Sequence, residues 1–120
     1  MVQAKEWGRI QRHKRVRTKV SGTADRPRVV VHRSLKHIHV QAIDDIAHKT
    51  IAALSSLDKS FLKAAPKKGK KTAAEQIGKL FADRLKKKGV QKIAFDRGGY
   101  LYHGRVKSLA EAIRQNGIQF

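Results

Sequence analysis

A helical pattern followed directly by a short apolar strand, over residues 72–95, is the feature that most constrains how this chain can fold. Apolar residues recur there at the spacing of one helix face, and Thr72 with Glu75 forms a capping-box pattern ahead of them. Gly89 suits the left-handed residue that ends a helix, and the three lysines before it suit the negative helix end. The sequence therefore predicts a helix from Thr72 to about Lys88.

The segment after this helix, Val90–Phe95, is predicted to be a strand. A strand reached through a helical crossover lies parallel to the strand that it joins. We therefore expect Val90–Phe95 to pair in parallel with the first strand, Arg28–Arg33, and to lie in the middle of a mixed sheet. The first strand, RVVVHR, is β-branched and nearly continuous, as expected of a strand covered on both faces.

Two further strands and a final helix complete the predicted fold. His37–Ile43 alternates between apolar and polar residues, so one face should be core and the other should face a partner. Thr50–Ser55 is the next strand, and short turns make these strands antiparallel. An apolar stripe predicts a last helix from about Arg105 to Gly117. The expected class is α/β, in the order β-β-β-α-β-α, with a four-stranded mixed sheet and two helices in one domain over residues 21–120.

The charge of the chain indicates a polyanionic partner. Lys and Arg number 28 against 9 Asp and Glu, a net charge of +19, far beyond what solubility requires. Nucleic acid is the first candidate, because neutralising phosphates releases counterions. An anionic membrane is second, but no long helix with one basic and one bulky apolar face is visible. The chain has no cysteine and no apolar run near the ~18 residues that cross a bilayer, so we expect a cytosolic protein without a membrane or small-molecule partner.

Residues 1–20 form a basic arm ahead of the predicted domain. The arm holds one acid, Glu6, and few large apolar groups, so it cannot build a core. We predict that it is flexible and disordered alone and orders on RNA, with a helix as one possible form, because its self-repulsion falls only when phosphates interleave. The alternative is a solvated tail without function. The cations of the arm are Lys5, Arg9, Arg12, Lys14, Arg15, Arg17 and Lys19.

Phe95–Arg105, FDRGGYLYHGR, is a loop held between a predicted strand and a predicted helix, and loops held in this way often carry function. Its glycines let backbone approach a ligand, its arginines supply fixed charge, and its rings can stack. This combination suits phosphate and unstacked bases. The alternative is that the glycines only make turns and the tyrosines only cover the core. The residues concerned are Arg97, Gly98, Gly99, Tyr100, Tyr102, His103, Gly104 and Arg105.

The histidines of the first two strands allow two interpretations. His37 and His39 share one strand face, and His32 lies on the neighbouring strand, so a zinc site is imaginable. The charges nearby are mostly cationic and would repel a metal. We instead expect a polar surface that touches sugar and phosphate, and no metal. That surface consists of Arg33, Ser34, Lys36 and His37.

Acidic residues at strand ends raise the question of catalysis. Asp44 and Asp45 are adjacent in a turn, which aims them apart, and turn chemistry explains both. Asp96 is expected to orient Arg97 or to cap loop amides. No serine has a paired base or a nucleophile elbow, and no Walker loop or dinucleotide fingerprint is present. We expect neither an enzyme nor a cofactor.

Two long motifs carry a resemblance to a known family. RPRVVVHRSLKHIHVQAIDD, residues 26–45, is followed by FDRGGYLYHGRVKSLAEAIRQNGIQF, residues 95–120. In this order and at this spacing they resemble the bacterial eighteenth large-subunit ribosomal protein, the family that binds 5S ribosomal RNA. The resemblance runs from about residue 9 to the C-terminus and includes RHKRVR in the arm. Two positions depart from the family: His48 stands where glycine is common, and Ser56 where threonine is common.

The resemblance implies a three-layer α/β fold with ribonuclease-H-like topology but without its catalysis, and the strand order 3-2-1-4. It implies a place in the central protuberance, where this protein, with the family-five ribosomal protein nearby, attaches 5S rRNA to the large-subunit rRNA. Carried over by position, the RNA-facing set is the arm from Arg9 to Lys19, the strand surface and the loop Arg97–Arg105. The rival function is nonspecific nucleic-acid packing, and regulation of its own messenger is also compatible.

Overall fold

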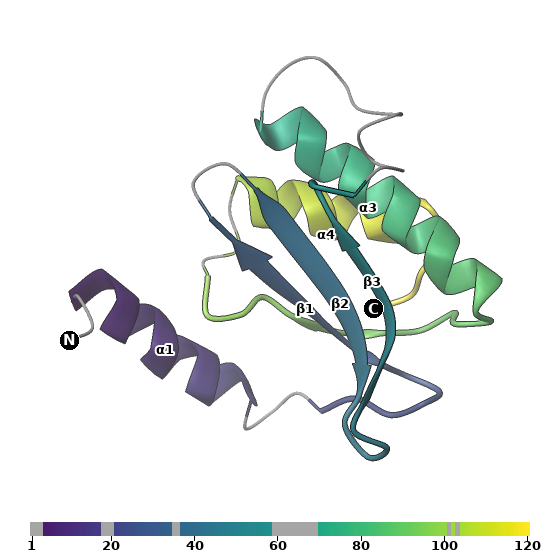
Figure 1. Cartoon of the computed structure of the whole chain (residues 1–120), viewed down its shortest axis with the longest axis horizontal. Coiled ribbons are helices and arrows are strands. Elements are labelled where there is room, and N and C mark those ends of the chain that lie inside the picture. The colour runs from purple at the N-terminus through teal and green to yellow at the C-terminus, as the bar shows by residue number, and fades with distance from the viewer. Residues whose placement is uncertain (1–3, 18–20, 35–36, 59–69, 101, 103) are drawn as a thin grey trace.

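The computed structural model describes residues 4–17, 21–34, 37–58, 70–100, 102 and 104–120. The elements follow the predicted order of strand, strand, strand, helix, strand and helix, preceded by a helix in the arm (Figure 1). This confirms the α/β class. The elements are α1 (Ala4–Arg17), β1 (Arg28–Arg33), β2 (Ile38–Asp44), β3 (Lys49–Ser55), α3 (Lys70–Lys87), β4 (Ala94–Asp96) and α4 (Arg105–Gln115).

The four strands form one mixed sheet in the order β3-β2-β1-β4, as the resemblance implied. β1 is antiparallel to β2 and β2 is antiparallel to β3, whereas β4 runs parallel to β1. The helix α3 lies between β3 and β4 in the chain, and a crossover of this kind returns the chain in the parallel direction. The predicted parallel pairing is therefore confirmed.

β4 lies at an edge of the sheet, so the predicted position in the middle is wrong. β2 already occupies one side of β1, which leaves only the other side for β4. β4 is also shorter than predicted, because the chain ahead of it pairs with the C-terminus. The Ile93 N–H donates to the Gln119 carbonyl at 3.0 Å, and the Gln119 N–H donates to the Gln91 carbonyl at 2.9 Å.

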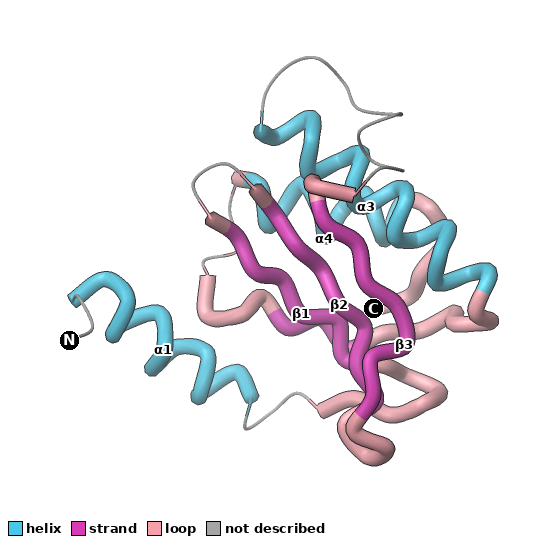
Figure 2. Tube along the Cα trace, viewed as in Figure 1, coloured by secondary structure: helices cyan, strands magenta, loops and turns pink. Residues whose placement is uncertain are grey.

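Helices α3 and α4 pack against each other and cover one face of the sheet (Figures 1 and 2). The sheet and this helical pair make two layers, where the resemblance implied three. Burial alternates along β2 as predicted, with Ile38, Val40 and Ala42 in the core. Within the described part of the chain, every buried residue of the core cluster lies between Val29 and Ile118. None of the described side chains of α1 therefore belongs to the core cluster.

The C-terminal end of α3 is a Schellman motif. Gly89 has a φ of 79°, and its N–H donates to the Lys86 carbonyl at 3.0 Å. The Val90 N–H donates to the Leu85 carbonyl at 2.9 Å. The predicted left-handed stop at Gly89 is therefore confirmed.

The starts of the two helices differ in how well the sequence predicted them. α3 begins at Lys70, so Thr72 lies inside its first turn and the capping-box prediction is wrong. Lys70 and Lys71 extend the helix ahead of Thr72, because lysine is a good helix former. α4 begins at Arg105, as predicted.

His48 occupies the left-handed region, with a φ of 54°, in the turn between β2 and β3. This conformation costs a residue with a Cβ about 1–2 kcal/mol, whereas glycine adopts it freely. We expect His48→Gly to raise the free energy of unfolding by about 1 kcal/mol in urea denaturation. His48→Ala keeps the Cβ and is the control. A His48→Gly protein no more stable than His48→Ala would contradict this account.

Candidate nucleic-acid interface

Asp96, the last residue of β4, is fully buried and lies at the centre of a hydrogen-bond network. Its Oδ1 accepts a hydrogen bond from the Gly98 N–H at 2.8 Å. Its Oδ2 accepts one from Arg28 Nη1 at 2.9 Å and lies 3.0 Å from His13 Nε2. The prediction that Asp96 caps a loop amide is confirmed. The guanidinium that it holds belongs to Arg28 on β1 and not to Arg97.

Arg28 joins Asp96 to a second carboxylate, Asp45. Arg28 Nε donates to Asp45 Oδ2 at 3.0 Å, and Nη2 donates to Oδ1 at 3.2 Å. Burial lowers the pKa of Arg28, but hydrogen bonds with Asp45 and Asp96 raise it by more. Asp45 also accepts the Gly22 N–H at 2.6 Å, so the prediction that turn chemistry explains Asp45 is wrong. The prediction is confirmed for Asp44, whose Oδ1 accepts two N–H groups of its own turn.

The two glycines after β4 bring parts of the chain itself into close contact. A Cβ added to Gly98 would lie 2.3 Å from the Val31 carbonyl oxygen in β1. A Cβ added to Gly99 would lie 2.3 Å from the Arg9 carbonyl oxygen in α1. The close approach that glycine allows is therefore used inside the molecule. Contact of these glycines with a ligand stays a prediction.

Helix α1 contacts this loop through one helix face. In Figure 2 it lies beyond the edge of the sheet that is nearer to β1 than to β3. Arg9 Nη1 donates to the Gly98 carbonyl at 3.1 Å, and Arg12 Nε donates to the Gly99 carbonyl at 2.9 Å. Arg9 Nη2 donates to Glu6 Oε1 at 2.6 Å. This hydrogen bond is the main cause that raises the pKa of Arg9. The arm is helical in the structure, while its predicted disorder without RNA stays a prediction.

Tyr100 is flanked by two guanidinium groups. The Cζ atoms of Arg9 and Arg33 lie 5.1 Å and 4.8 Å from the centre of its ring, and its hydroxyl donates to the Arg33 carbonyl at 3.1 Å. Arg105 Nη2 donates to the Ser34 carbonyl at 2.7 Å. Burial, and then the charge of Arg33, lower the pKa of Arg105. The strand surface and the loop therefore meet in one group, the Tyr100 cluster, formed by Arg9, Arg33, Ser34, Tyr100 and Arg105.

The remaining predicted contacts lie around this cluster or outside the described residues. On α1 the exposed cations include Lys14 and Arg15. His37 is exposed just before β2, with its Nδ1 3.0 Å from Ser56 Oγ, and Arg97 is half-buried. Tyr102 is 41% exposed. Arg17 ends α1, but its side chain is not among those described, and Lys19, Lys36 and His103 lie outside the described residues.

Comparison with known proteins shows the family. The sequence model of the family described as ribosomal L18 of archaea, bacteria, mitochondria and chloroplast matches residues 3–120. The chain belongs to the ribosomal L18 family. Proteins named large ribosomal subunit protein uL18 are 50% identical in Kosmotoga olearia, 53% in Lactobacillus delbrueckii subsp. bulgaricus and 54% in Listeria innocua. Each match spans 112 residues, 93% of this chain and 92% of the relative.

Membership of the L18 family confirms the resemblance found in the two sequence motifs. This L18 protein is a structural component of the large ribosomal subunit and not an enzyme. Its location is the ribosome, in the cytoplasm, and its partners are ribosomal RNA and other ribosomal proteins. Among the described residues, no helix is long and apolar enough to span a membrane.

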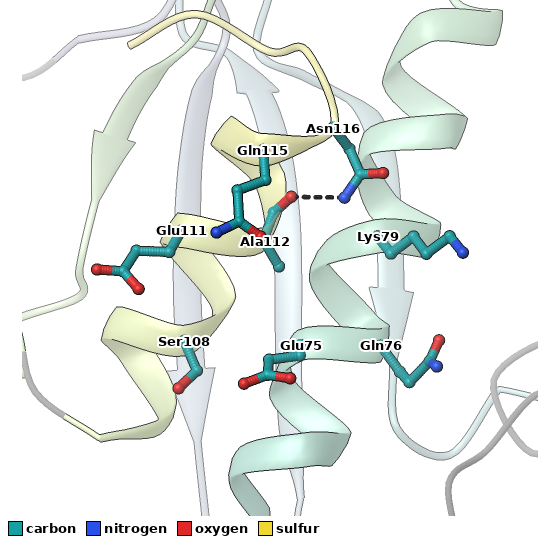
Figure 3. Close-up of a pocket in the computed structure, with 8 residues that line it drawn as sticks. All are labelled: Glu75, Gln76, Lys79, Ser108, Glu111, Ala112, Gln115 and Asn116. Atoms are coloured by element: carbon teal, nitrogen blue, oxygen red, sulfur yellow. Dashed lines mark hydrogen bonds between the residues drawn. The ribbon is translucent and has the colours of Figure 1, made fainter.

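A polar groove of about 340 Å³ lies between α3 and α4 of the L18 protein (Figure 3). Glu75 reaches from α3 toward α4, whereas the carboxylate of Glu111 points away from α3. Ser108, which is buried, lines the groove together with these two carboxylates. The lining residues are Glu75, Gln76, Lys79, Ser108, Glu111, Ala112, Gln115 and Asn116.

His32 and His39 are paired across β1 and β2, with stacked rings whose centroids lie 6.3 Å apart. The described residues contain no group of three or more His, Cys, Asp or Glu side chains that could hold a metal ion. His32 is exposed at the end of β1, yet partial burial of its ring lowers its pKa, and the charges of His39, His13 and Arg9 lower it further, against a smaller opposing effect of Asp96. The neutral form of His32 is therefore favoured in the folded protein.

Acidification is expected to destabilise the L18 protein through His32. The unfolded chain protonates this ring near its ordinary pKa of ~6.5, while the folded protein does so only at lower pH. The stability is fully present above the unfolded pKa and is lost as the pH falls through the folded pKa. We expect the free energy of unfolding, measured by urea denaturation at several pH values, to fall below about pH 6.5. His32→Gln should reduce this fall relative to wild type, and an unaltered pH dependence would refute the assignment.

Proposed function

We propose that this L18 protein binds 5S rRNA and helps to attach it to the large-subunit rRNA in the central protuberance, with the family-five ribosomal protein nearby. The net charge of +19 and the family's place in the large subunit support a nucleic-acid partner. The Tyr100 cluster next to the exposed cations of α1 is the observation that carries the proposal. A ring between guanidinium groups is suited to bases and phosphates together.

Each part of the proposed surface has a chemical role. Arg33 presents a guanidinium fork that matches phosphate oxygens in pairs, while Arg105 adds positive charge beside it and uses one nitrogen on the Ser34 carbonyl. The exposed ring of Tyr102 can stack on an unpaired base. Lys14 and Arg15, exposed on α1, are suited to phosphate neutralisation along a groove. The other residues of the predicted set remain part of the proposal.

A salt titration tests the proposed function. Binding of the full chain to 5S rRNA is compared with binding to an unrelated RNA duplex of equal length, from about 0.05 to 0.5 M salt. Specific recognition keeps a preference for 5S rRNA as salt screens the electrostatic contribution. The excess of cations alone would equally suit a nonspecific packing protein, whose affinities for the two RNAs would fall together. Loss of the preference at all salt concentrations would reject 5S recognition.

The loop is expected to contribute measurably to RNA affinity. Arg97→Ala and Tyr100→Ala should each weaken 5S rRNA binding by about 1–3 kcal/mol, the range for a bidentate contact or a stacked base. Filter binding measures the change. Arg114→Ala is the matched control, because Arg114 lies in the last turn of α4 with its Cζ 4.3 Å from the centre of the Phe120 ring. If both loop variants bind like Arg114→Ala, the loop takes no part in binding.

A further inference from the structure

We propose that exposed lysines at the C-terminal end of α3 form a second RNA-binding surface, which binds phosphates of the large-subunit rRNA. This surface is named the lysine patch, and its members are Lys86, Lys87, Lys88 and Lys92. The inference deepens the proposed function and rests on it, because a protein that attaches 5S rRNA to another RNA must hold both. The Tyr100 cluster is the surface proposed for 5S rRNA, which leaves the lysine patch for the other RNA.

The end of α3 and the C-terminal segment bring the lysine patch together. A Cβ added to Gly117 would lie 3.3 Å from Lys86 Cε, so the side chain of Lys86 extends over the turn that follows α4. Two residues beyond this turn residue, Gln119 pairs with Lys92 in a parallel bridge. Lys88 directly follows the last residue of α3. The four lysines therefore surround the place where both helices end.

No carboxylate neutralises the lysine patch within the described part of the chain. The described residues give none of its four amines an ion pair or a side-chain hydrogen bond. Asp83 precedes Lys87 by about one helical turn and is exposed, yet the two side chains form no ion pair. Like charges gathered at one end of the molecule repel one another, and a bound phosphate backbone removes that repulsion.

The negative end of α3 does not account for the whole lysine patch. A cation is favourable at a helix C-terminus only within the last turn, whereas Lys92 lies five residues beyond the end of α3. The Gly89 and Val90 N–H groups already bind carbonyl groups of the last turn. One or two lysines therefore suffice for the helix end, and the other amines are open to a ligand.

The lysine patch and the Tyr100 cluster lie at opposite ends of α4. Arg105, a member of the cluster, is the first residue of α4, and Lys86 covers the turn after its last residue. The 11 residues of α4 span about 16 Å at about 1.5 Å per residue. In Figure 1, α4 begins toward the left of the domain and α3 ends at its right-hand side. Salt screens charges over about 8 Å at physiological ionic strength, so each surface attracts phosphate independently.

Lysine is suited to contacts that follow an RNA backbone without reading its bases. Its ammonium group is a strongly hydrated point charge on a flexible stem, so it can follow phosphates of different geometry. Contacts of this kind fix the position and direction of a protein on RNA. The lysine patch is therefore expected to orient the protein on the large-subunit rRNA, while the rings and guanidinium groups of the Tyr100 cluster remain for 5S rRNA.

Salt-dependent binding to large-subunit rRNA without 5S rRNA tests the lysine patch. The patch variant of the full chain carries Lys86→Gln, Lys87→Gln and Lys88→Gln. We expect it to lower the slope of log K against log salt by about 2 to 3, and the affinity by roughly 10- to 100-fold at about 0.15 M salt. Its affinity for 5S rRNA should stay within about twofold of wild type, because the Tyr100 cluster lies beyond the screening length.

A second variant separates the lysine patch from the charge of the whole protein. Lys49→Gln, Lys79→Gln and Lys107→Gln together remove the same charge from exposed positions on β3, α3 and α4. We expect this control to keep a salt slope close to that of wild type on large-subunit rRNA. An equal loss in both variants would show that only total charge matters and would overturn the inference. Loss of 5S rRNA binding in the patch variant would overturn it as well.

Acylation of lysine amines tests the lysine patch in the unaltered protein, so it does not depend on the folding of a variant. We expect the four amines to react in the free protein and in its complex with 5S rRNA. They should lose most of that reactivity, measured by mass spectrometry, when large-subunit rRNA is added in excess. Lys49 in β3 is the internal control and should react equally in all three states. Protection by 5S rRNA alone, or no protection with both RNAs, would overturn the inference.

The lysine patch and the proposed function would fail in different ways. A wild-type protein without preference for 5S rRNA rejects the proposed function. A patch variant that binds large-subunit rRNA like wild type rejects the lysine patch. If the four amines react in both RNA complexes but are protected in the intact large subunit, a neighbouring ribosomal protein covers them and the assignment to RNA is wrong.

Discussion

Asp96→Ala is expected to lower the free energy of unfolding by about 3–5 kcal/mol, the range for removing one partner of a buried charge pair. The Asp96 carboxylate is fully buried and accepts hydrogen bonds from Arg28 and from the Gly98 N–H. Among the described residues, alanine would leave Asp45 as the one carboxylate that binds the Arg28 guanidinium and would remove the acceptor of the Gly98 amide. Urea denaturation measures the loss.

An exposed carboxylate provides the control for Asp96. Glu111 on α4 lies 4.0 Å from Lys107 Nζ, with about half of its side chain exposed. Exposed pairs at i, i+4 contribute about 0.3–0.5 kcal/mol, so Glu111→Ala should change the stability by no more than that. A loss below about 1 kcal/mol in Asp96→Ala would show that the network does not hold this end of the sheet.

Removal of residues 1–20 is expected to weaken 5S rRNA binding about 10²- to 10³-fold at about 0.15 M salt, which is the contribution of about four phosphate contacts. The salt slope should fall by about 3 to 4 at the same time. The truncated protein should still fold, because the core cluster draws no described residue from α1. Filter binding across a salt series measures both quantities.

One outcome of the truncation would reject a role of the arm in RNA binding. A chain beginning at Ser21 that binds as tightly as the full chain would identify the arm as a solvated tail. Unchanged urea unfolding of the truncated domain would show that any loss of affinity comes from the arm itself.

The sequence predicted the elements well because their signals are local. The alternation of apolar residues in β2 and the glycine that ends α3 both act over a few neighbouring residues. The length of β4 was predicted wrongly because it depends on the C-terminus. Gln119 forms backbone hydrogen bonds with Gln91 and Ile93. The apolar pattern of residues 90–95 does not indicate that partner.

The site was predicted less completely, because its central contacts join distant residues. Arg28, directly before three apolar residues of a predicted strand, was the one signal that could have led to the network, since a buried cation requires a carboxylate partner. The acids at the ends of β2 and β4 were noticed, but Asp45 was assigned to turn chemistry alone. The contact of α1 with Gly98 and Gly99 could not be predicted, because a glycine pattern indicates a close approach without indicating which segment approaches.

The contact of α1 with the loop after β4 also has a consequence for the order of events during synthesis. Arg9 and Gly98 are 89 positions apart, and His13 and Asp96 are 83 apart. At 5–20 residues per second, the helix is made about 4 to 18 s before its docking place exists. Throughout that interval the nascent chain carries Arg9 and Arg12 without their carbonyl acceptors, open to any polyanion that it meets.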